Sequence, residues 1–106
     1  MQSLVNYVQS IHEGSDTPRI TLRASRHDSW SDQGFEVSRE VTDYHFDDGV
    51  VIRRTTEQDQ FPTELACAEC WIEYEVIERA GLDIQPARKH FDNRCREAWW
   101  LRYHSA

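Results

Sequence analysis

The chain has 106 residues and a net charge of −7, a size that holds one domain and excludes a second hydrophobic core. Only 22 residues are Leu, Ile, Val or Phe, but four each of Trp, Tyr and Phe favour a lightly cored folded domain over a disordered chain. No stretch has the length and apolarity of a membrane span or a signal peptide, so a cytoplasmic protein without a membrane partner is expected.

Four glycines and three prolines divide the chain into six segments. In the first, residues 3–13, the spacing of Leu4, Val8 and Ile11 predicts a short helix. Residues 19–27 alternate apolar and polar side chains, which is typical of a half-exposed strand.

The next two segments predict the rest of a small sheet. Residues 35–46 alternate as a strand does, but the apolar phase changes before Tyr44, which predicts a β-bulge near Thr42–Asp43. Residues 47–49 read Asp-Asp-Gly and predict a hairpin loop, and residues 50–58 predict the returning strand. Together these segments predict a three-stranded antiparallel meander.

Residues 63–80 fit two structures. Their many Glu, Ala and Leu residues and the glycine at Gly81 favour a helix. The alternation from Ile72 to Val76 favours instead a fourth strand over residues 65–78. The helix is the preferred interpretation, and the strand is the alternative.

Residues 86–104 predict a further helix, since proline at Pro86 suits a first helical turn. The expected fold is therefore a single α+β domain over residues 1–106. It has an N-terminal helix, the three-stranded meander, and two C-terminal helices packed on one face.

Three cysteines are too few for a disulfide scaffold and suit a reducing compartment. Cys67, Cys70, His90 and Cys95 have a loosely zinc-like spacing, but His90 and Cys95 would point about 140° apart on a helix. We therefore expect no metal and no other cofactor. In the expected helical hairpin, Cys70 and Cys95 lie at the same height and form a candidate thiol pair.

Catalytic motifs are missing from the sequence. Its five histidines are scattered, and it has no nucleophile elbow, no H-E-x-x-H pattern and no Gly-rich phosphate loop. We therefore expect that the protein is not an enzyme.

Charge is divided unevenly along the chain. Residues 1–83 contain seven Arg and no Lys against seventeen Asp and Glu, whereas residues 84–106 contain five Arg and Lys against two acidic residues. On the expected last helix one face combines basic and aromatic side chains, which are common in binding hot spots. The candidate partner-binding residues on this face are Lys89, Arg96, Trp100 and Tyr103. The alternative is that Trp100 belongs to the core.

A second candidate surface is acidic. Its members are expected near the hairpin end of the meander and its exit loop, and they are Asp43, Asp47, Asp48, Glu57 and Asp59. Carboxylates arranged in this way can occupy a basic site that normally holds phosphates.

These observations predict a small acidic protein-binding module that associates with a second copy of itself, as a homodimer, through its last helix. A basic protein is the other expected partner. An acidic inhibitor or immunity-type protein that blocks a nucleic-acid-handling protein is the first alternative. A nucleic-acid binder that uses the basic helix is the second, although the acidic body would repel a polyanion.

Overall fold

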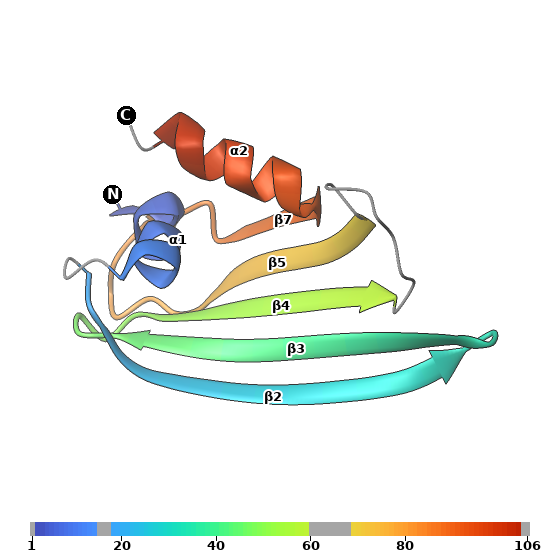
Figure 1. Cartoon of the computed structure of the whole chain (residues 1–106). Helices are drawn as coiled ribbons and strands as arrows, with labels where there is room; N and C mark the ends of the chain where they lie inside the picture. Colours follow the sequence, from blue (N-terminus) through green and yellow to red (C-terminus); the bar gives the residue numbers. More distant parts are fainter. Residues whose placement is uncertain (1, 15–17, 60–68, 105–106) are drawn as a thin grey trace.

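A computed structural model describes residues 2–14, 18–59 and 69–104. It consists of a twisted antiparallel sheet with both helices on one face (Figure 1). In chain order the elements are β1 (Gln2–Ser3), α1 (Leu4–Glu13), β2 (Ile20–Asp32), β3 (Phe35–Phe46), β4 (Val51–Asp59), β5 (Glu69–Glu78), β6 (Ile84–Gln85), β7 (Arg88–Asn93) and α2 (Arg94–His104). Neither described helix is long and apolar enough to cross a membrane.

The main sheet has the strand order β2-β3-β4-β5-β7, and every neighbouring pair is antiparallel. The short strands β1 and β6 form a separate parallel pair. In Figure 1 both helices lie near β5 and β7, while most of β2 and β3 extends away from them. The sheet therefore has a covered half and an uncovered half.

Helix α1 agrees with its predicted residues. Leu4 and Val8 are fully buried, as the apolar spacing requires. Gly14 ends the helix with φ of 70°, and its amide donates to the Ser10 carbonyl at 2.9 Å. Glycine reaches this left-handed conformation without a steric penalty.

The predicted hairpin loop at residues 47–49 is also present. Gly49 has φ of 90°, and its amide donates to the Phe46 carbonyl at 3.0 Å. The Asp48 carboxylate accepts the Val50 amide at 3.0 Å, which is a typical use of aspartate in a turn. Local sequence is enough to define this turn.

The core lies between the helices and the covered half of the sheet. It buries side chains from α1, α2 and the five strands β3, β4, β5, β6 and β7. Its fully buried aliphatic members are Leu4, Val8, Val50, Ile52, Ile72 and Ile84. Tyr74 is fully buried among them and carries a hydroxyl that needs polar partners.

The predicted fold class is wrong, because the described chain has two helices and a five-stranded sheet. Residues 69–78 form strand β5, as the alternative interpretation had it, and residues 63–68 lie outside the described residues. Pairing with β4 and β7, and burial of alternate side chains such as Ile72 and Tyr74, outweigh the helix propensity of this segment.

The last segment is not one helix either. Residues 88–93 form β7, and α2 begins only at Arg94. The Asn93 side chain accepts the Arg96 amide at 2.8 Å, so Asn93 caps the helix. This cap marks the boundary between strand and helix.

The predicted bulge near Thr42–Asp43 is also wrong, since both pairings of β3 continue through these residues without a shift. The phase change has another cause. Phe46 is buried on the face that the helices cover, whereas Val37 is buried on the opposite face. The two ends of one regular strand therefore bury opposite faces.

Candidate binding site

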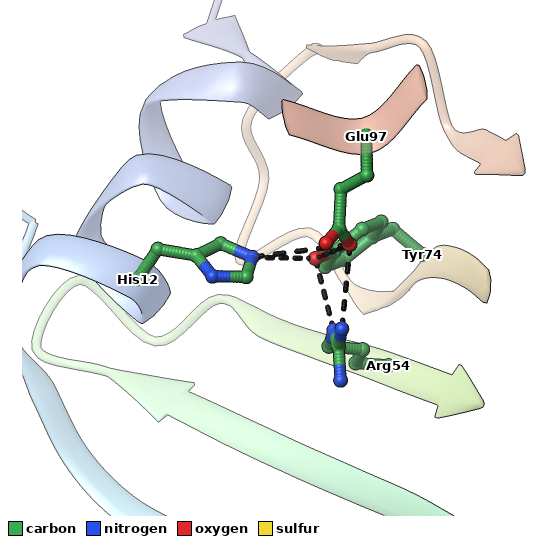
Figure 2. A network of polar contacts seen from close by, with 4 residues as sticks. All are labelled: His12, Arg54, Tyr74 and Glu97. Carbon is green, nitrogen blue, oxygen red and sulfur yellow. Dashed lines mark hydrogen bonds and ion pairs between the residues drawn. The ribbon is translucent and has the colours of Figure 1, made fainter. Parts of the chain in front are cut away.

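Four polar side chains from four elements meet beneath α2 (Figure 2). The Tyr74 hydroxyl of β5 donates to Glu97 Oε2 of α2 at 2.6 Å. The Tyr74 hydroxyl oxygen in turn accepts from Arg54 Nε of β4 at 2.9 Å and lies 2.8 Å from His12 Nε2 of α1. Because the single phenolic proton goes to Glu97, His12 Nε2 is the donor in the last contact. This polar network joins both helices to two central strands.

Burial and charge determine the protonation of the polar network. Burial is the main cause that raises the pKa of Tyr74 above its ordinary value, so the phenol keeps its proton. Burial also lowers the pKa of His12, against the opposing effect of Glu97. Burial alone would lower the pKa of Arg54, but Tyr74 and Glu97 raise it overall. The network therefore favours a neutral His12 beside the Arg54–Glu97 ion pair.

The polar network is suited to positioning rather than to substrate chemistry. Tyr74 has no exposed surface, and Glu97 is 6% exposed. A buried ion pair whose groups are also hydrogen-bonded favours one arrangement of the elements that carry it. Glu97 thereby fixes the start of α2 over β5, which places the following turn of α2 beside β7.

An open hollow of about 490 Å³ lies beside the polar network, between α2 and β7. It is lined by residues 88–92 of β7 and by Arg96, Trp99 and Trp100 of α2. Phe91 and Trp100 are buried at its base, with 5.3 Å between their ring centroids. We call this site the β7–α2 hollow.

The rim of the β7–α2 hollow is aromatic and exposed. Trp99 is 60% exposed, and it stacks on Tyr103 with 5.4 Å between the ring centroids. Large exposed aromatic side chains beside a buried apolar base are typical of protein-binding sites.

The charge of the β7–α2 hollow opposes that of the whole chain. Arg88, Lys89 and Arg96 line it together with one carboxylate, Asp92, although the chain has a net charge of −7. Arg88 Nε already lies 2.8 Å from Glu73 Oε1. Within the described part of the chain, neither Lys89 nor Arg96 forms an ion pair. Their charges are therefore available to an acidic ligand.

Three of the four predicted partner-binding residues meet at this hollow, but they do not share a helix face. Lys89 lies on β7, and Arg96 and Trp100 lie on α2. Trp100 is only 9% exposed and belongs to the core, as the alternative interpretation had it. Tyr103 is exposed beside the hollow and contacts it through Trp99.

The predicted acidic surface does not form one cluster. Asp43 pairs with Arg53 at 2.8 Å, and Asp48 accepts the Tyr7 hydroxyl at 2.6 Å. Asp47 accepts the Arg19 amide at 3.3 Å. Glu57 lies near the other end of β4, six residues or about 20 Å from its first residue. The Asp59 side chain lies outside the described part, and the others are divided between two regions.

The candidate thiol pair is not linked. Cys70 is a free thiol buried on β5, and Cys95 is disulfide-bonded at the start of α2. The helical hairpin that placed the two at one height does not form. No group of three potential metal ligands occurs among the described residues, and Cys67 lies outside them. His90 instead stacks on Trp71 at 4.5 Å.

The sequence also contains signals for four further residues of the site. Arg54 follows Ile52 with strand spacing, so the two share a face, and an inward Arg54 requires an inward acid. Glu97 is the one acidic residue of the last helix and provides it. Asn93 had the residue type and position of a helix cap. Trp99, adjacent to Trp100, is the exposed member of that pair.

Comparisons with protein-family models, with curated proteins and with solved structures find no match. The function of the β7–α2 hollow is therefore inferred from its own residues and geometry.

Proposed function

We propose that the protein is a non-enzymatic protein-binding module whose binding site is the β7–α2 hollow. The observation that supports this function most strongly is that exposed Trp99 and Tyr103 lie near Lys89 and Arg96, two cations that form no ion pair among the described residues. Tryptophan, tyrosine and arginine account for much of the binding energy at protein interfaces.

The charge of the hollow selects the partner. Arg88 is already paired with Glu73 and Glu75, but Lys89 and Arg96 attract a carboxylate-bearing ligand, and the acidic remainder of the chain repels nucleic acid. The apolar base formed by Phe91 and Trp100 accepts an aliphatic side chain. The proposed ligand is therefore an acidic protein segment that also carries apolar residues.

A random peptide display library tests this function directly. Library selection on the immobilised wild-type protein is expected to enrich acidic peptides that contain aliphatic residues. Selection on the Trp99→Ala, Arg96→Glu double variant is expected to lose this enrichment. The matched control is Trp30→Ala, Arg39→Glu, which changes the same residue types on β2 and β3, far from the hollow.

Four outcomes would contradict the proposal. The wild-type protein could enrich no peptide, or both double variants could retain the enrichment. The control variant alone could lose the enrichment, which would assign the binding site to the uncovered half of the sheet. A low-salt gel shift that is lost with Arg96→Glu would assign the hollow to nucleic acid instead.

A further inference from the structure

The strand β7 forms an edge of the main sheet beside the β7–α2 hollow. In the described chain it pairs with β5 on one side, and no strand lies on its other side. An edge strand exposes backbone amides and carbonyls that can pair with another chain. The direction of these groups decides whether β7 can bind an added strand.

One backbone hydrogen bond establishes that direction. The Val76 amide donates to the Ala87 carbonyl at 2.9 Å. The register of β5 and β7 pairs Glu75 with Arg88, and its continuation by one residue places Val76 opposite Ala87. Hydrogen-bonded and non-hydrogen-bonded pairs alternate along an antiparallel ladder. Lys89 therefore bonds inward to β5, whereas the amides and carbonyls of Arg88 and His90 point outward from the sheet.

We propose that the β7–α2 hollow binds its partner by strand addition, with an extended acidic segment pairing as a sixth strand against the outward backbone groups of Arg88 and His90. This inference rests on the proposed function and specifies the conformation of the ligand. Main-chain hydrogen bonds hold such a segment, and alternate side chains determine which segments bind.

The alternation of side chains defines the pattern of the ligand. Lys89 and Phe91 point to the helix-covered face, because their partners Tyr74 and Ile72 do. A residue of the added strand on that face lies beneath α2, near Arg96 and the apolar base. A ligand with carboxylate or aliphatic side chains at every second position therefore matches the residues that line the hollow. The side chains between them face solvent.

Charge argues against a second copy of the chain as the added strand. Another copy of β7 would supply a single carboxylate, Asp92, together with two further cations, so it leaves the pair with a net positive charge. The other edge strand, β2, carries two arginines and two aspartates and offers no net negative charge. The ligand is therefore a segment of a different, acidic protein.

Synthetic peptides of roughly ten residues test strand addition. The parent peptide has threonine at every second position, with glutamate and valine between. In two further peptides every second backbone amide is N-methylated. One peptide carries the methyl groups on the threonine amides, and the other carries them on the glutamate and valine amides. Only one set faces β7, so one methylated form is expected to bind about tenfold more weakly and the other like the parent. A peptide with lysine in place of glutamate is expected not to bind.

Binding is measured from the change in tryptophan fluorescence and from hydrogen exchange of the β7 amides. Strand addition predicts that the outward Arg88 and His90 amides become protected from exchange in the complex. If both methylated forms bind like the parent and these amides stay unprotected, strand addition is wrong but the binding function stands. If neither these peptides nor any library peptide binds, the proposed function itself is wrong. Concentration-dependent dimers measured by light scattering, with His90 protected, would identify a second copy as the occupant.

Discussion

The same antiparallel sheet has two halves with very different surroundings. In the covered half, Ile52, Ile72 and Tyr74 are fully buried against the helices. In the other half, every residue from Thr21 to Trp30 of β2 is exposed. We call residues 23–40, which form the far part of the β2–β3 hairpin, the arm. The backbone ladder is continuous through both halves, so hydrogen bonding alone does not explain the difference.

The comparison indicates that the covered half provides most of the stability of the fold. A two-stranded hairpin without a packed face is marginally stable in water, whereas burial of apolar side chains stabilises the strands beneath the helices. The proposed binding site lies on the covered half, where Phe91 and Trp100 are fixed by the core. A preorganised site loses less conformational entropy on binding than a site on the arm would.

The largest expected effect comes from shortening a buried side chain in the covered half. Ile72→Ala should lower the free energy of unfolding by about 4 kcal/mol, because a fully buried side chain leaves a cavity. Leu22→Ala, at a position that is 57% exposed, should change it by less than about 0.5 kcal/mol. Urea unfolding of both variants measures the difference. Equal losses would mean that the two halves contribute equally to stability.

A smaller difference in stability is expected between substitutions on the two faces of strand β4. Arg53 and Arg54 are neighbours, but Arg54 pairs with buried Glu97 and Arg53 with partly exposed Asp43. Arg54→Met should cost about 2 kcal/mol because it leaves the Glu97 carboxylate buried without its cation. Arg53→Met should cost no more than about 1 kcal/mol. If Arg53→Met is the more destabilising variant in urea unfolding, the polar network does not support the covered half.

The parts of the fold that sequence predicts are those decided by adjacent residues. Helix α1 and the turn at Gly49 depend on a local apolar spacing and on one glycine. Strand β5 depends instead on pairing with β4 and β7, so its glutamates favoured the wrong local structure. Propensity acts within a few residues, whereas this pairing joins segments far apart in the chain.

The candidate site shows the same division. Lys89, Arg96 and Trp100 were found from composition, because basic and aromatic residues concentrate near the C-terminus. Their arrangement was not predicted, since it depends on the strand-to-helix boundary at Asn93. Glu97 has its ion-pair partner 43 residues away, so only the tertiary fold identifies that contact.

The polar network also predicts a pH dependence that the arm does not share. Glu97, Arg54, Tyr74 and Glu13 surround His12, and burial holds its pKa below the ordinary value of 6.5. The unfolded chain therefore binds a proton more readily than the folded chain just below pH 6.5. The contribution of His12 is fully present above that pH and decreases as the pH falls towards the folded pKa.

His12→Gln should reduce this loss, because glutamine keeps a donor for Tyr74 and does not titrate. His27→Gln on the arm is the matched control and should leave the pH dependence as in the wild type. Urea midpoints at about pH 7.5 and about pH 5.5 bracket the ordinary histidine range. A His12→Gln variant that loses as much stability on acidification as the wild type would contradict the assigned role of His12.

The smallest expected effect is confined to the arm. The Arg39 guanidinium lies 5.0 Å from the Trp30 ring centroid, and such a contact contributes about 0.5–1 kcal/mol at an exposed site. Arg39→Ala should therefore accelerate hydrogen exchange of amides between Arg26 and Arg39, because the arm opens locally without unfolding the core. The urea midpoint of the whole protein should not change, since α2 packs on β7 and β5 and the β2 residues of the arm are exposed. A lowered midpoint would show that the arm and the covered half unfold as one cooperative unit, and the contrast between them would then concern burial alone.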